Sequence, residues 1–183
     1  MSEKKGEKKY MEYKIILIGN SAVGKNAFFK CTSLESISIP DSVKSIGEYA
    51  FGNCTSLTSI SILDSIKSIG DGAFYNCAHL TSIKIPDSVK SIRSWTFDNC
   101  TSLKSISIPD SVESIGHSAF HDCTSLKEVV FKGKTLEEVQ AMDFYPWGIK
   151  DESVIKAEKS LNESKYDKQV HFWAHMLDEA FVK

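Results

Sequence analysis

The sequence lacks any strong excess of charge of one sign. Its 183 residues carry 22 lysines and arginines against 24 aspartates and glutamates, a formal net charge of −2. Such a balance provides no overall field that would draw the chain to nucleic acid or to an anionic membrane. The lysines near the start are interleaved with glutamates, which predicts a solvated, disordered tail over residues 1–12.

Long apolar runs are also missing. The stretch 15–18 is far too short to cross a bilayer, and the first residues lack the apolar core of a secretory signal. These absences predict a cytoplasmic protein with no membrane span.

Closely spaced cysteines are absent as well. The chain has five cysteines, each 23 residues from the next: Cys31, Cys54, Cys77, Cys100 and Cys123. An odd number cannot pair completely in disulfides, and no C-x2-C spacing of the kind that binds zinc is present. Because a buried cysteine behaves as a small hydrophobic residue, we expect structural thiols, with no metal and no cofactor.

The same 23-residue period holds throughout residues 31–131. The unit reads C-T-S-L-x-S-I-x-I-P-D-S-V-x-S-I-G-x-x-A-F-x-N. Its L-x-x-I-x-I part alternates as a half-buried strand does, and prolines such as Pro40 end the strand because they cannot donate to a sheet. We expect a second short strand in S-V-x-S-I, a tight bend at glycines such as Gly47, and one helical or 3-10 turn in A-F-x-N-C.

One unit cannot bury its own apolar face, so stacked units are expected to share a continuous core. The unit N-C-T-S-L-x-S-I-x-I-P-D-S-V-K-S-I-G-x-x-A-F resembles the BspA-like class of leucine-rich repeats, residue by residue over four full repeats. The repeat pattern and this resemblance together predict an α/β solenoid dominated by short β-strands, a right-handed coil with a C-terminal helix.

The resemblance also implies a function. It indicates a module that is not an enzyme and that acts in adhesion or protein–protein contact, with a protein partner. Members of this class are frequently surface proteins, so the resemblance implies the cell surface as an alternative to the cytoplasm.

Residues 132–149 are predicted to close the array. Thr135 to Glu138 form a capping-box pattern that opens a short helix through about Asp143, and residues 145–147 offer a bulky apolar plug. Residues 150–183 are predicted to be a linker and an amphipathic helix, 166–181, which would bind a partner, mediate self-association or fold back onto the solenoid.

Residues 13–30 allow three interpretations, one of which is an inactive remnant of a phosphate loop joined to the array. The segment KIILIGNSAVGK resembles the first strand and phosphate loop of a Rab-type small GTPase, which would bind GTP through Gly19, Gly24 and Lys25. Asn26 stands where a Ser or Thr would hold Mg²⁺, and the repeats leave no room for the rest of a nucleotide-binding sheet. In the competing register, Gly24, Ala27 and Phe28 fall on repeat positions and form an abbreviated first coil.

Two groups of residues are candidates for partner binding. The residues between the core positions of each strand should face out as a polar ladder, and the third repeat adds an arginine and a tryptophan at variable positions. The full set is Ser36, Ser38, Ser59, Ser61, Ser82, Lys84, Arg93, Trp95, Ser105 and Ser107. The alternatives are that the ladder is only a solvated sheet surface and that Trp95 packs over the adjacent coil.

Overall fold

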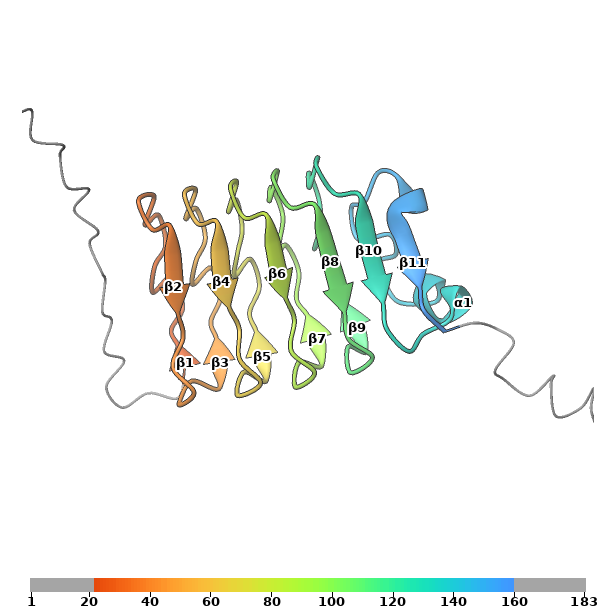
Figure 1. The fold of residues 1–183 in the computed structure, drawn as a ribbon, viewed down its shortest axis with the longest axis horizontal. Coiled ribbons are helices and arrows are strands. Elements are labelled where there is room, and N and C mark those ends of the chain that lie inside the picture. Colours follow the sequence, from red (N-terminus) through yellow and green to blue (C-terminus); the bar gives the residue numbers. More distant parts are fainter. Residues whose placement is uncertain (1–21, 160–183) are drawn as a thin grey trace, which may run out of the picture.

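A computed structural model describes residues 22–159 as a stack of coils (Figure 1). The predicted tail 1–12, most of the strand and phosphate-loop segment, including Gly19, and the predicted helix 166–181 lie outside the described residues. The expectations for those segments stay predictions.

Each coil contributes one strand to the front of the molecule, as drawn in Figure 1. All pairings are parallel, in a two-stranded sheet β2–β4 and a four-stranded sheet β6–β8–β10–β11. The strands are β2 (Ser36–Ser38), β4 (Ser59–Ser61), β6 (Ser82–Lys84), β8 (Ser105–Ile108), β10 (Glu128–Phe131) and β11 (Ile155–Ala157). We call the outward side chains of β2, β4, β6, β8 and β10 the strand face.

A second parallel sheet runs along the next side of each coil, in the order β1–β3–β5–β7–β9. Its strands are β1 (Ala22–Val23), β3 (Ser45–Ile46), β5 (Ser68–Ile69), β7 (Ser91–Ile92) and β9 (Ser114–Ile115). Residues 23 apart are partners, as in the pair Val23 and Ile46, so the sequence period is the structural register.

The segment that follows this sheet, such as 47–54, is a chain of turns, so the prediction of a helical or 3-10 turn was wrong. Tyr49 and Asn53 have positive φ angles of 49° and 59°, which breaks a helix. Alternate backbone N–H groups donate to the next coil, for example Phe51 N to Ala73 O at 2.9 Å. We call these the turn segments and their outward side chains the turn face.

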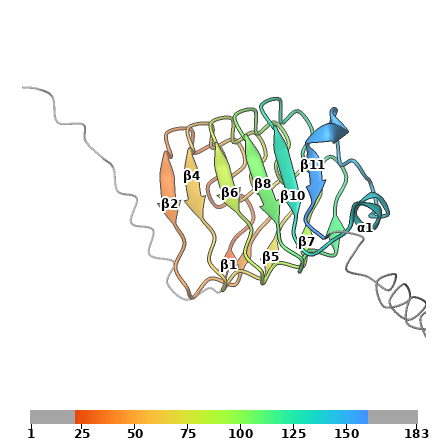
Figure 2. The same ribbon diagram turned by 45° about the vertical axis from the view of Figure 1, so that its right-hand side comes forward.

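The β-dominated solenoid is therefore confirmed, but the α/β class is not supported. Within residues 22–159 the helices are α1 (Leu136–Gln140) and one turn of 3-10 helix, Glu152–Val154. The view in Figure 2 shows both at the end of the stack, after the last repeat.

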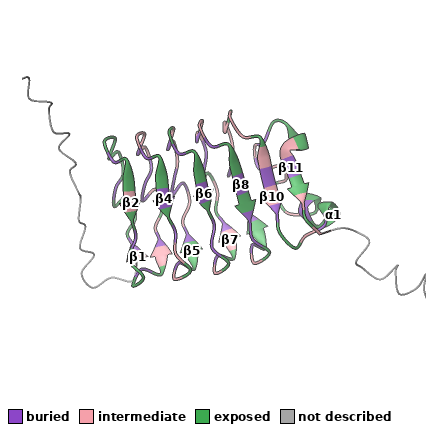
Figure 3. Cartoon of the chain, in the orientation of Figure 1, coloured by how far each residue is buried: buried purple, intermediate pink, exposed green. Residues whose placement is uncertain are grey.

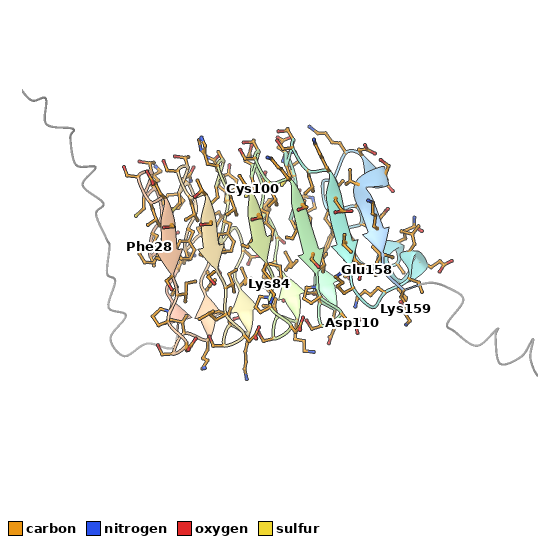
Figure 4. The ribbon with its side chains drawn as sticks, in the orientation of Figure 1. Phe28, Lys84, Cys100, Asp110, Glu158 and Lys159 are labelled. Atoms are coloured by element: carbon orange, nitrogen blue, oxygen red, sulfur yellow. The ribbon has the colours of Figure 1, made fainter. Side chains whose placement is uncertain are left out.

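The core is a column of stacked phenylalanines at the repeated A-F position. Consecutive ring centroids lie 5.1, 5.5, 5.6 and 5.6 Å apart, and the planes are within 9° of parallel. The column consists of Phe28, labelled in Figure 4, and Phe51, Phe74, Phe97 and Phe120. Phe28 extends this column before the first cysteine, so residues 22–30 pack as a coil of the array.

The cysteines form a second internal ladder. Each thiol from Cys54 onward donates to a phenylalanine carbonyl of the preceding coil, for example Cys54 Sγ to Phe28 O at 3.1 Å and Cys100 Sγ to Phe74 O at 3.2 Å. Burial raises the pKa of Cys54 to about 11 and that of Cys123 to about 12, and holds that of Cys100 well above its usual value. All five cysteines are free, Cys31 is exposed, and the structural role predicted for the buried ones is consistent with these contacts.

The repeated glycine has a different role from the tight bend that the sequence predicts. A Cβ at Gly47, Gly70 or Gly116 would lie 2.7, 2.6 or 2.4 Å from backbone atoms of the preceding coil. None of the three has a positive φ. These glycines therefore allow close contact between coils, and their conformational freedom is not what the fold requires.

The C-terminal end is closed only partly as predicted. The helix is slightly shorter than expected, and strand β11 (Ile155–Ala157), which pairs with β10, comes from the segment predicted to be a linker, so that prediction was wrong for these residues. The Thr135 side chain accepts from the Glu138 N–H and the Glu138 carboxylate accepts from the Thr135 N–H, which is the expected capping box. Helix α1 ends at Gln140 instead of near Asp143. Trp147 is fully buried, with its ring centroid 5.4 Å from that of Phe131, so it covers the end of the core.

Glycine substitutions test the close contact between coils. Gly70→Ala should lower the free energy of unfolding by about 1–3 kcal/mol, because the new methyl group meets the backbone of the preceding coil. Gly24→Ala is the matched control, since a Cβ there meets nothing within 4 Å. It should be neutral or stabilising by about 0.4–1 kcal/mol. Urea unfolding of both variants measures the difference, and equal effects would contradict the role assigned to Gly70.

Thiol labelling tests the cysteine ladder. Under native conditions iodoacetamide should modify Cys31 rapidly, whereas Cys54, Cys77 and Cys100 should react only after unfolding, because burial suppresses their thiolates. Peptide mass spectrometry before and after denaturation identifies the modified positions. Rapid native labelling of Cys77 would show that the ladder opens.

Candidate functional site

The strand face is a flat, polar surface. Ser36 pairs with Ser59 across β2 and β4, and Ser82 pairs with Ser105 across β6 and β8. The strand-face candidates of the array are exposed, as Figure 3 shows by the green strands β2, β4, β6 and β8. These are Ser36, Ser38, Ser59, Ser61, Ser82, Lys84, Ser105 and Ser107. The structure thus brings these eight together, with Lys84 (labelled in Figure 4) as the one charged side chain among them.

Arg93 and Trp95 lie elsewhere. They belong to a turn segment, which is separated from strand β6 by strand β7 along the coil. The Arg93 guanidinium lies 3.6 Å from the Asp71 carboxylate of the preceding coil, and Trp95 is 41% exposed. The two predicted groups therefore form separate surfaces.

The turn face is built from two columns, and each column contains one equivalent residue from every coil. The first column has positive φ in every coil and consists of Asn26, Tyr49, Gly72, Trp95 and Ser118. The second column lies three residues later and consists of Phe29, Gly52, Tyr75, Asp98 and His121. Along each column large aromatic side chains alternate with smaller residues. A coil that has a large ring in one column has a smaller residue in the other column.

Because of this offset, aromatic rings alternate between the columns. The Phe29 and Tyr49 ring centroids are 6.4 Å apart and those of Tyr49 and Tyr75 are 6.0 Å apart, both edge to face. Each glycine gives room for the ring of the preceding coil: a Cβ at Gly52 would lie 2.9 Å from the Phe29 ring, and one at Gly72 would lie 2.3 Å from the Tyr49 ring.

The aromatic contacts continue toward the C-terminal cap. His117 lies edge to face with Trp95, at a centroid distance of 6.2 Å, and with Phe144 of the cap, at 6.0 Å. Phe29, Trp95 and Phe144 are 38%, 41% and 61% exposed, although large aromatic side chains usually bury most of their surface. Together these rings form an aromatic band along the turn face, defined here by Phe29, Tyr49, Tyr75, Trp95, His117 and Phe144.

A shallow hollow of about 430 Å³ lies in the first half of this band. Its walls include Phe29, Tyr49, Tyr75 and Trp95, and its polar lining is Asn26, Asn53 and Asp98. Asp98 is only 8% exposed, and its Oδ1 atom accepts hydrogen bonds from Asn99 Nδ2 at 3.0 Å and His121 Nδ1 at 3.1 Å. Within residues 22–159, no cluster of three acidic, histidine or cysteine side chains could hold a metal ion.

The phosphate-loop candidates within the described residues are in the first coil. Gly24 adjoins Gly47 of the next coil. Lys25 Nζ lies 2.6 Å from the Glu48 carboxylate, and this hydrogen-bonded pair raises the pKa of Lys25 and lowers that of Glu48. Phe28 is part of the core column, so the segment takes the competing repeat register.

Sequence reasoning found only part of the aromatic band. It selected Trp95 as a departure from the consensus and noted aromatic residues such as Tyr49, Tyr75 and His117 at neighbouring variable positions, but it included neither Phe29 nor Phe144. The usable signal was the set of positions 26, 49, 72, 95 and 118 and the set 29, 52, 75, 98 and 121, read down the repeats. Which of these positions face outward depends on the path of the turn segment.

The fold resembles solved leucine-rich-repeat structures. A leucine-rich repeat protein from Bacteroides ovatus is 35% identical, over 74% of this chain and 39% of that one, with a TM-score of 0.59. The leucine rich repeat protein of T. pallidum is 27% identical, over 61% of this chain and 67% of that one, with a TM-score of 0.54. A leucine rich cell surface protein from Faecalibacterium prausnitzii is 31% identical, over 60% and 35% of the two chains, with a TM-score of 0.49.

The chain thus spans about two fifths of the Bacteroides ovatus protein. A comparison with curated proteins finds no match. These findings give no support to the resemblance with a Rab-type GTPase. The sequence profile of the BspA type leucine rich repeat region matches residues 21–148 in six copies. The chain therefore belongs to the BspA-type leucine-rich-repeat family.

Proposed function

We propose that this protein is a non-enzymatic interaction or adhesion module that binds a protein partner through the aromatic band on its turn face. The observation that carries this proposal is the exposure of large aromatic side chains at left-handed backbone positions. Aromatic residues are the usual anchors of protein interfaces, whereas serine is uncommon among them.

The backbone conformation strengthens the argument. Tyr49 and Trp95 have φ angles of 49° and 56°, at a position that Asn26 and Gly72 fill in other coils. Asparagine and glycine tolerate this conformation, while a bulky residue there costs of order 1 kcal/mol or more. Rings held at such a cost, with Trp95 exposed and Tyr49 half-buried, are better explained by binding than by folding.

The strand face is the weaker candidate. Its serines and Lys84 remain a proposed second contact surface, since repeat proteins commonly bind along their strands. Small hydroxyl groups on a flat sheet equally make a solvated surface. Only Lys84 gives this set a long side chain.

The structure gives no support to nucleotide binding. Lys25, which would neutralise phosphate in a phosphate loop, is paired with Glu48, and Gly24 belongs to the coil stack. Residues 22–159 contain no helix long and apolar enough to span a membrane. A protein partner suits either the cell surface, which the family implies, or the cytoplasm.

Trp95→Asn separates binding from stability. Partner affinity should fall about tenfold or more, as for an aromatic anchor. The unfolding midpoint should stay equal or rise, since asparagine tolerates the left-handed conformation. A photo-crosslinking residue at position 117, beside Trp95, identifies the partner, and titration calorimetry with the purified partner measures affinity.

Ser61→Asn, on the strand face, is the matched control for Trp95→Asn. It should leave partner affinity unchanged. If Ser61→Asn weakens binding while Trp95→Asn does not, the partner uses the strand face and the proposal is wrong.

A fluorescent GTP analogue tests the alternative function. In the presence of Mg²⁺ the full chain should show no saturable binding, because Phe28 belongs to the core column and the segment takes the repeat register instead of a phosphate loop. The Lys25→Ala variant should give the same fluorescence titration as the wild type. Micromolar binding that Lys25→Ala abolishes would establish the phosphate loop and overturn this expectation.

A further inference from the structure

The hollow in the aromatic band combines ring faces with one carboxylate. Its lining contains four aromatic rings, two asparagines and Asp98, and no lysine or arginine. An aromatic ring attracts a cation to its face, and the attraction is larger where water is partly excluded. A carboxylate at the same place adds a direct electrostatic partner.

Asp98 has the arrangement expected of a recognition group. Its backbone position is the one that Gly52 and Tyr75 occupy in the preceding coils, so the repeat itself does not require a carboxylate there. Asn99 and His121 hold its Oδ1 atom, which fixes the carboxylate and leaves Oδ2 as the acceptor for a ligand. A carboxylate that is 8% exposed is normally paired. Among the ion pairs of residues 22–159, the partner of Asp98 is His121, whose Nδ1 atom lies 3.1 Å from Oδ1, and no lysine or arginine pairs with it.

We infer that this hollow binds an arginine side chain of the partner protein, with the guanidinium against the Tyr49, Tyr75 and Trp95 rings and hydrogen-bonded to Asp98. This inference rests on the proposed function and specifies the chemistry of its partner. The inference rests on charge complementarity between the Asp98 carboxylate in the hollow and a cation on the partner.

Arginine fits better than other cations for two reasons. Its planar guanidinium stacks on aromatic faces and donates to carboxylates in a fixed fork, whereas a lysine ammonium is a strongly hydrated point charge. The band continues past the hollow to His117 and Phe144, which suits a polypeptide lying along the turn face more than a small free ligand. Lys30, whose Nζ lies 5.6 Å from the Phe29 ring centroid, already places one cation against this surface.

The test compares two capped amino acids with nearly the same shape. N-acetyl-arginine methylamide and its citrulline counterpart differ in charge, and the lysine counterpart is the third probe. Each is titrated into the isotope-labelled full chain while the indole N–H signal of Trp95, assigned with Trp95→Phe, is followed by NMR. Arginine should bind saturably, with citrulline weaker by about tenfold and lysine between them.

Variants locate the site. Asp98→Asn should weaken arginine binding several-fold and leave citrulline binding unchanged, whereas Asp64→Asn, an exposed aspartate on another loop, should change neither. Tyr49→Leu removes a ring and should weaken both probes. It keeps the inference testable if Asp98→Asn does not fold.

Three results would overturn the inference: equal affinity for arginine and citrulline, no saturable binding of arginine by the wild type, or unchanged arginine binding in Asp98→Asn. These outcomes are distinct from failure of the proposed function. If Trp95→Asn abolishes partner binding while arginine and citrulline bind alike, the aromatic band is the interface and the charge-specific contact is absent.

Discussion

The parallel stacking of coils in a 23-residue register is the constraint on which everything else depends. Because each coil lies directly on its neighbour, every buried group meets its own equivalent one coil away. The phenylalanine column and the thiol-to-carbonyl ladder are two results of this register. The glycines at 47, 70 and 116 are a third, since the stacked backbones leave no room for a Cβ.

This constraint also determines where the repeats are free to vary. Side chains directed inward must match the next coil, so phenylalanine, leucine and cysteine recur with little change. Side chains on the turn face point outward, and there the sequence alternates rings with glycines and polar residues. The alternation lets a ring from one coil lie over a glycine of the next, which gathers rings from residues far apart in the chain into one aromatic band.

Much of the fold could be predicted from the residues. The period placed the strands, the alternating isoleucines gave their buried side, and the capping box at Thr135 predicted helix α1. The turn segments could not be predicted well, because A-F-x-N-C is compatible with a helical turn until the left-handed conformation of Asn53 and its equivalents is known. The candidate site was found only in part: Trp95 and Arg93 were selected, and the second predicted group, the serine ladder, lies on another side of the coil.

The sequence by itself determined the repeat, the solenoid, the buried cysteines and the family, since a period of 23 residues is a one-dimensional property that maps directly onto stacked coils. It also indicated that residues 24–28 fit the repeat as well as they fit a phosphate loop. Only the tertiary structure decided that Lys25 pairs with Glu48 and that Phe28 begins the core column. It alone brought Phe29, Tyr49, Tyr75 and Trp95 around Asp98, because contact between coils depends on how each turn segment directs its side chains, and that direction is not encoded in any one repeat.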